Sequence, residues 1–473
     1  MMNEANEASV SPAPHSAQAA DPSRRNDTTY YLIALFVGAM TGLIGTALHL
    51  GVDAILEWPK YLHRAVDLDL GHFLLLTGAV SATLVVLSVA LVRNLAPEAG
   101  GSGVQEIEGA MAGLREVRWR RVLVAKFFGG FLSLGSGLVA GREGPTIHMG
   151  ASIAQGASER LGLGPRDTRG LLAAGAAAGL AAAFGAPLAS ILFVIEETRR
   201  QFPYSLKTYS AVMIASVASG VVTEALTGRR PFMMIEVPDI AISSLPAFIG
   251  LGILLGFVGV AFNHCLVRAM DQALAFGSRV SFYVLPAIVG FVIGVLLIVV
   301  PEATQGGEAL AVTLTTEHMP LITIAAVVLI RFVMTMASYS IGAPGGIFAP
   351  ILALATAIGL FYGLVLDVYV PLPDGMLPAL AVAAMGGLFS ATVRAPLVGV
   401  VLLAELTGAY SILVPGIITC LVANIVADRL GGRPIYEVLL ERTLRLSGTP
   451  VPDEAATGKT DEQKNAIGGW DQR

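Results

Sequence analysis

The chain has 473 residues, of which 54% are hydrophobic and only 14% charged, with a net charge of −5 and a mean hydropathy of +0.70. Soluble globular chains average about 25% charged residues, so this composition excludes that class, and the acidic balance excludes a nucleic-acid partner. Long, nearly charge-free runs each approach the roughly 20 residues that a helix needs to cross a bilayer. They fall at 31–57, 73–92, 246–262, 283–300 and 321–338. We expect an all-α polytopic membrane protein.

The two ends of the chain differ from this apolar body. Residues 1–28 are polar and carry no secretory signal pattern, so we expect a disordered cytosolic tail, and residues 446–473 have the same character. Two basic loops, at 114–121 and 198–207, belong on the cytosolic side by the positive-inside rule. Read instead as patches for anionic lipid, they would still face the inner leaflet. Both termini are therefore expected in the cytosol.

The sequence repeats itself at an offset of about 207 residues. "GREGP" (141–145) and "GIFAP" (346–350) share a glycine and a proline, 205 residues apart. "GAPLASILFVIEE" (185–197) matches "RAPLVGVVLLAEL" (394–406), so that Glu196 and Glu405 are 209 apart. Duplicated halves with interrupted helices are typical of transporters, whose sites lie where the halves meet. We expect halves at 29–230 and 231–445, although glycine and proline are also common in membrane helices generally.

Three glycine-rich segments each lead into an apolar helix: 100–111, 140–150 and 342–353. The first N–H groups of a helix lack partners, and the helix dipole adds partial positive charge there. Irregular backbone at membrane depth is tolerated only inside protein or beside a wet cavity. If the three N-termini converge, they form a dehydrated anion site.

These segments carry a family resemblance. "GSGVQE" (101–106), "GREGP" (141–145), "GGIFAP" (345–350) and "GRPIY" (432–436), in this order, resemble the anion-pathway motifs of the CLC family of chloride channels and chloride/proton exchangers. The resemblance spans about residues 30–445 and is greatest to the bacterial exchangers. It implies an inverted repeat with broken and re-entrant helices around a central anion pathway. It also implies a homodimer with one pathway per subunit in the cytoplasmic membrane, chloride, protons and membrane lipid as partners, and no cofactor or metal.

The resemblance assigns an anion-binding role to four residues. The Ser102 hydroxyl, the Tyr436 phenol and the backbone N–H groups of Ile347 and Phe348 are expected around the central anion. Taken alone, Ser102 could be an ordinary N-cap and Tyr436 an interfacial tyrosine. The expected selectivity filter comprises Gly101, Ser102, Gly103, Val104, Gln105, Gly141, Arg142, Glu143, Gly144, Pro145, Gly346, Ile347, Phe348, Ala349 and Pro350.

Glu143 resembles the gating glutamate of the family. A carboxylate is itself an anion, so a site built for chloride also accommodates Glu143, and protonation would release it. It would thus be both gate and proton carrier, in keeping with the rule that intramembrane ionisable residues are functional. Arg142 is expected to tune the field at the outer mouth, and His148 to serve helix packing or polar bonding.

Glu197, the second acid of "FVIEETRRQF" (193–202), resembles the residue that takes up cytosolic protons in exchangers. The alternative is a helix-end acid paired with Arg199 or Arg200. Lys126 matches a lysine of the exchangers and is expected to raise the local potential for anions, with a structural ion pair as the alternative.

One position departs from the family. Members usually read G-S-G-I-P-E where this chain has "GSGVQE", so Gln105 replaces a proline and adds one backbone donor. A proton-coupled chloride exchanger is the first interpretation and a passive chloride channel the second. An intramembrane enzyme is the third, but the sequence lacks G-x-S-x-G and H-E-x-x-H motifs. Ser102 also argues against the nitrate-preferring members, and the filter differs from that of the fluoride exporters.

Overall fold

A computed structural model describes residues 22–450, except 229–232, 234, 236, 239, 317 and 318. Within these residues the chain is helical and its only β-contacts are two isolated bridges, which confirms the all-α fold class. Eight of the described helical segments are long and apolar enough to span a membrane. The first half contains α1 (Pro22–Ile55), α2 (Trp58–Ala65), α3 (Leu70–Leu95), α4 (Val104–Met111), α5 (Trp119–Gly135), α6 (Glu143–Leu161), α7 (Pro165–Phe184), α8 (Pro187–Glu197) and α9 (Leu206–Thr227).

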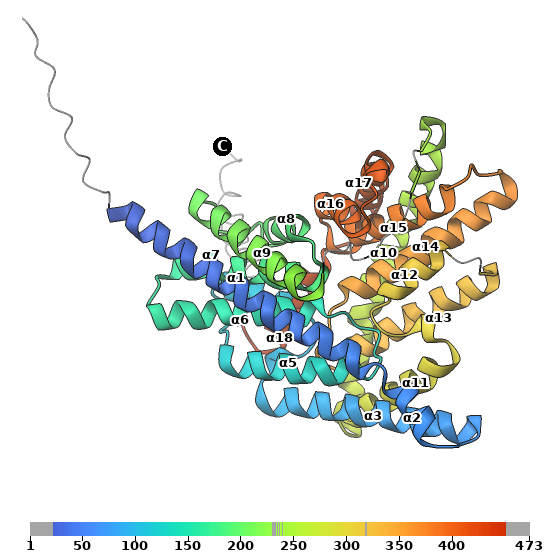
Figure 1. The fold of residues 1–473 in the computed structure, drawn as a ribbon, viewed down its shortest axis with the longest axis horizontal. Coiled ribbons are helices and arrows are strands. Elements are labelled where there is room, and N and C mark those ends of the chain that lie inside the picture. The colour runs from blue at the N-terminus through green and yellow to red at the C-terminus, as the bar shows by residue number, and fades with distance from the viewer. Residues whose placement is uncertain are drawn as a thin grey trace, which may run out of the picture.

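The second half repeats this order from α10 onward. It contains α10 (Leu245–Arg279), α11 (Val284–Val299), α12 (Glu308–Thr316), α13 (Leu321–Ser340), α14 (Phe348–Tyr369), α15 (Met376–Val393), α16 (Pro396–Thr407), α17 (Leu413–Arg429) and α18 (Ile435–Leu446). The packing is repeated too: α6 lies on α7 as α14 lies on α15, and α1 lies on α9 as α10 lies on α17. The halves lie side by side in Figure 1, blue to green and yellow to red. Their contacts include α3 against α11 and α8 against α16.

Small residues bring the central helices close together. In α7, a Cβ added to Gly175 would lie 2.3 Å from the carbonyl oxygen of Gly150 in α6, and one added to Gly179 would lie 2.3 Å from that of Thr146. Such contacts let backbones approach without the hydrophobic driving force that water would supply. The equivalent helix α15 is the most enclosed of the spans, with 89% of its apolar window buried. These central helices therefore form a rigid frame for the segments between them.

The helices begin and end differently from the expected tails. Helix α1 starts at Pro22, so residues 22–28 of the expected tail are helical, and residues 1–21 lie outside the described part. At the other end α18 stops at Leu446, and residues 451–473 of the expected tail are likewise outside it. The eight-residue helix α4 is too short for a hydropathy signal, although it leads directly from the first glycine-rich segment.

Candidate functional site: an anion pathway between two carboxylate stations

The three glycine-rich segments converge and are joined through their backbones. Gly101 donates its N–H to the carbonyl of Ala343 at 3.1 Å and accepts from the N–H of Gly345 at 3.1 Å. Gly141 and Gly346 exchange both of their hydrogen bonds, at 2.9 and 2.7 Å. Two pieces of the first half are thus fixed to one loop of the second half, which is the arrangement that a shared anion site requires.

Gly144 lies at the point where these segments touch. A Cβ placed on Gly144 would be 2.8 Å from the Cα of Ser102 and 2.9 Å from the Cα of Gly346. Nearby, Gly103 has a φ of +91°, and a Cβ there would lie 2.4 Å from Nδ1 of His148. His148 is therefore packed against the first segment, and its Nδ1 has no hydrogen-bond partner among the described residues.

The carboxylate of Glu143 occupies the N-terminus of α14. Its Oε1 accepts the backbone N–H of Phe348 at 2.8 Å and that of Ala349 at 3.3 Å, while the side chain is buried. Its Oε2 has no hydrogen-bond partner in the described structure. A Cβ on Gly141 or Gly346 would lie within 2.0 Å of a Glu143 carboxyl oxygen, so the group lies in a slot between two glycines. A negative charge is held here by backbone donors at a helix N-terminus, as a free anion would be.

Ser102 and Tyr436 are both buried beside this slot. The Ser102 hydroxyl has no hydrogen-bond partner at normal distance among the described residues, although Tyr436 lies close enough to interact with it. The N-cap of α4 is Gly103, whose position makes no side-chain cap, so the N-cap alternative for Ser102 is wrong. Tyr436 contacts the ring of Phe193 at 6.2 Å between centroids, and it is not an interfacial tyrosine. Two hydroxyls thus remain available to a buried anion.

Lys126 supports the first segment from behind. Its Nζ donates to the carbonyl of Gly101 at 2.7 Å and to that of Ser102 at 3.0 Å, and it is fully buried. These are hydrogen bonds to backbone, and the ion-pair alternative has no counterpart in the described residues. The ammonium therefore orients the carbonyl groups and places a positive charge behind Ser102.

Arg142 connects the slot with a cavity of about 380 Å³ that is lined by α1, the loop before α6 and the loop before α12. Its Nη2 lies 3.0 Å from Glu308, its Nη1 lies 3.9 Å from Asp53, and its Nε donates to the carbonyl of Ala183 at 3.1 Å. Sequence reasoning did not single out Glu308 or Asp53. Their carboxylates partly compensate the charge of Arg142, the residue predicted to tune the field at the outer mouth.

Glu197 lies at the opposite end of the pathway, where it lines one small cavity together with the buried Glu108 of α4. Two neighbouring carboxyl groups favour holding one proton between them, because two adjacent negative charges repel. Of the two arginines considered as partners of Glu197, Arg200 pairs with Glu437 at 2.9 Å, and Arg199 makes no ion pair with Glu197 in the described structure. A cavity of about 50 Å³ beside Glu108 and Glu197 is large enough for a few water molecules. Sequence reasoning missed Glu108, whose only signal was a second acid in "GSGVQEIEG".

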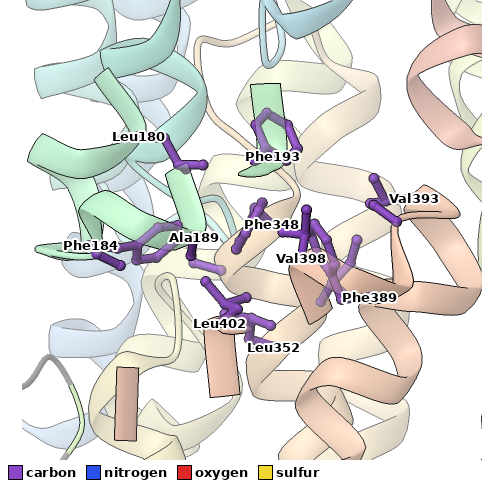
Figure 2. Close-up of a cluster of buried hydrophobic side chains, with 14 of the residues drawn as sticks. Leu180, Phe184, Ala189, Phe193, Phe348, Leu352, Phe389, Val393, Val398 and Leu402 are labelled. Atoms are coloured by element: carbon purple, nitrogen blue, oxygen red, sulfur yellow. The ribbon is translucent and has the colours of Figure 1, made fainter. Parts of the chain in front are cut away.

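A cluster of buried aromatic side chains packs around Phe348. Phe348 packs on Phe389 at 4.4 Å and on Phe184 at 4.9 Å between centroids, and Phe193 adjoins Tyr436. Figure 2 shows the four phenylalanines converging from α7, α8, α14 and α15, with Val398 and Leu402 of α16 beside them. Through Phe193, Tyr436 adjoins α8, the helix that ends at Glu197, and Phe348 in the same cluster donates its N–H to Glu143.

The fold and the site together define a multi-pass membrane protein with a buried anion site at the meeting point of two repeated halves. The chain belongs to the voltage-gated chloride channel family, whose model matches residues 82–428. This is a family of transport proteins, and the expected family is therefore confirmed.

Named relatives are similar over most of the chain. A "H(+)/Cl(−) exchange transporter ClcA" of Vibrio parahaemolyticus is 44% identical, covering 88% of this chain and 90% of its own length. Its counterpart in Salmonella paratyphi B is 41% identical over 87% of this chain and 88% of its own. A crystal structure of a slow cyanobacterial Cl⁻/H⁺ antiporter superposes with a TM-score of 0.84 at 35% identity, covering 88% of this chain and 98% of that one. The inverted-repeat architecture is thus the observed fold.

Proposed function

We propose that this protein exchanges chloride for protons across the cytoplasmic membrane, with Glu143 as the gate of the anion pathway. The observation that carries the proposal is the Glu143 carboxylate, held by the N–H groups of Phe348 and Ala349 at a helix N-terminus. The relatives named as H⁺/Cl⁻ exchangers, at 41–44% identity over most of both chains, support it.

Competition for one donor explains how the gate works. The N–H of Phe348, assigned to the central anion together with that of Ile347, is taken by Glu143 in this structure. Chloride that uses this donor therefore needs Glu143 to leave. Protonation removes the negative charge that the helix N-terminus favours, so a protonated Glu143 is released while an ionised one returns. Ser102 and Tyr436 then offer their hydroxyls to the chloride ion.

Protons take a separate inner route. In this proposal Glu197 and Glu108 take up a proton beside the small cavity that both line, and the aromatic cluster around Phe348 adjoins Glu143. We place the route past Tyr436, whose ring contacts Phe193 of α8, the helix that ends at Glu197. Chloride cannot follow through such a carboxylate-ended route, because a desolvated anion beside a carboxylate is repelled.

A passive chloride channel is the second candidate, since a Glu143 gate alone would serve it. The neighbouring carboxyl groups of Glu197 and Glu108 favour exchange, because a passive channel does not need a buried group that takes up protons. The test is a sealed vesicle containing the purified protein, an imposed chloride gradient and a pH-sensitive dye inside. Exchange predicts that the chloride gradient drives protons against their own gradient. A chloride gradient that dissipates with no proton movement would establish the channel.

We also infer the orientation and assembly. The basic loops at 114–121 and 198–207 and both tails, 1–28 and 446–473, are assigned to the cytosol by the positive-inside rule. The homodimer follows from the resemblance to the family, and exposed apolar side chains on α8, α9, α16 and α17 offer one surface for it: Leu188, Met213, Val217, Val221, Leu397, Val414, Ile417 and Leu421. Each subunit would keep its own pathway, since all the site residues come from one chain.

A further inference from the structure

A second charged cavity lies away from the anion pathway, between the loop before α5 and the α6–α7 connection. Its volume is about 1080 Å³, and it is lined by five arginines and two glutamates. The arginines are Arg115, Arg118, Arg120, Arg121 and Arg169. A cavity of this size and composition exceeds what the passage of a monatomic anion requires.

Two of the five arginines are already neutralised. Arg115 donates to Glu106 at 2.8 Å, and Arg118 donates to Glu98 at 2.7 Å. Arg120, Arg121 and Arg169 are exposed and make no ion pair with any described residue. Three guanidinium groups therefore face one cavity without an ion pair, beside the carboxylates of Glu116 and Glu159, and guanidinium groups that converge in this way bind phosphate.

Trp119 lies at the edge of this cavity with cations on its ring. The guanidinium carbons of Arg120 and Arg160 lie 5.1 and 4.9 Å from its ring centroid, and its Nε1 donates to Glu159 at 2.8 Å. A tryptophan with one polar contact and an apolar body is typical of the membrane–water interface. The cavity is thus placed at the level of the lipid headgroups.

The exposed face of α5 leads from the cavity toward the bilayer. Arg121, Val124 and Phe128 are spaced i, i+3 and i+7 and so share one face of the helix. The side chains of Val124 and Phe128 are 45% and 53% exposed. An apolar stripe that continues from a group of free arginines matches a molecule with a phosphate at one end and an acyl chain at the other.

We propose that this cavity binds the phosphate group of an anionic phospholipid of the inner leaflet, with an acyl chain lying along α5 over Val124 and Phe128. The proposal rests on the cytosolic placement of residues 114–121 inferred above and is independent of proton coupling. Ala110 and Gly113 line the same cavity, and α4 joins them directly to the Ser102 segment. A bound lipid would therefore brace the helix that leads into the anion site.

The test measures thermal unfolding of the full-length protein in neutral detergent with added phosphatidylglycerol, phosphatidylcholine or soluble glycerol 3-phosphate. The pocket variant is Arg120→Gln, Arg121→Gln and Arg169→Gln together. The matched control, Arg166→Gln, Arg279→Gln and Arg429→Gln, removes three exposed arginines outside the cavity. A second variant, Val124→Ser with Phe128→Ser, leaves every arginine in place.

Phosphatidylglycerol should raise the Tm of the wild type and of the control triple, and the other two additives should not. The pocket variant should need a roughly tenfold to hundredfold higher lipid concentration for the same rise, as expected for three guanidiniums near a membrane surface. The serine variant should also lose part of the rise. An equal effect of glycerol 3-phosphate would show a soluble ligand, and an equal loss in the control triple would show unspecific attraction; either result overturns the proposal. If the pocket variant does not fold, an unchanged rise in the serine variant overturns it.

Discussion

Glu196 and Glu405 occupy equivalent positions in the two halves. Each carboxylate caps the N-terminus of the helix to which the other glutamate belongs. Glu196 of α8 accepts the N–H groups of Leu397 and Val398 in α16, the nearer at 2.9 Å. Glu405 of α16 accepts those of Leu188 and Ala189 in α8, at 2.9 and 2.6 Å. Glu196 and Glu405 are thus reciprocal helix caps. Glu197, one residue after Glu196, instead lines a cavity together with Glu108.

The helix cap formed by Glu405 should contribute to the free energy of unfolding and not to the coupling of chloride and proton transport. Glu405→Gln keeps an acceptor oxygen but removes its charge, so we expect a loss of about 0.5–2 kcal/mol, the cost usual for a weakened N-cap. Thermal unfolding in detergent should show a lower Tm, while the chloride/proton ratio in vesicles stays that of the wild type. A changed ratio would mean that Glu405 takes part in transport.

Removing the charge of Glu197 should separate the two fluxes. Glu197→Gln cannot release a proton, so the inner end of the proton route is lost while the anion donors are untouched. We expect chloride flux to continue and the chloride-driven pH change in vesicles to disappear. Persistent proton pumping by this variant would leave Glu108 as the inner proton acceptor, and Glu108→Gln is then the variant to compare.

Glu143→Gln mimics the protonated gate. The amide no longer competes as an anion for the N–H of Phe348, so chloride flux should become independent of pH and of protons. Glu143→Asp keeps the charge but shortens the side chain by one methylene, and we expect slow exchange. Both variants are measured by chloride efflux across a series of external pH values. A glutamine variant that still pumps protons at the wild-type ratio would contradict the gate assignment.

Gln105 should influence anion preference modestly. Gln105→Pro removes the backbone donor that this chain adds at the start of α4, and a neutral hydrogen bond contributes about 0.5–1.5 kcal/mol. We expect the permeability ratio of chloride to nitrate to change by no more than about tenfold, with coupling intact. The Gln105 side chain also borders an inner cavity shared with Tyr339 and Glu106, and its Oε1 has no partner in the described structure. If anion-substitution flux shows an unchanged chloride-to-nitrate ratio, Gln105 acts on this cavity and not on anion preference.

Glu308 should reduce the attraction of Arg142 for incoming chloride. Glu308→Gln weakens the pair with Arg142 and frees positive charge for incoming chloride, so the external chloride concentration for half-maximal flux should fall. Partly exposed pairs contribute little, so the change is expected to stay below about fivefold. Glu302→Gln lines the same cavity without contacting Arg142 through its side chain and is the matched control. Equal shifts in both variants would show a general field effect, not an action through Arg142.

The sequence predicted the fold class, the repeat and the segments that meet at the site, because each has a local signature in glycine, proline and apolar runs. It could not supply partners joined only by tertiary packing, such as Glu108 with Glu197 or Glu308 with Arg142. The role of a fully buried arginine could not be predicted from the sequence either. Arg331 donates to the carbonyls of Glu302, Thr304, Gln305 and Gly306 and holds the loop before Glu308 in place. The apolar residues that flank Arg331 in the sequence do not indicate whether its guanidinium binds a protein loop or faces lipid.

The pairing of Gly141 with Gly346 also constrains how the molecule is made. The ribosome must synthesise 205 further residues before Gly141 meets its partner, and 242 separate Gly101 from Ala343. Until then the glycine segments of the newly inserted first half have open N–H and C=O groups at membrane depth, where each needs water or a temporary partner. Truncated products that end before residue 340 should consequently bind no chloride and should be prime targets for membrane proteases, whatever the quality of their individual helices.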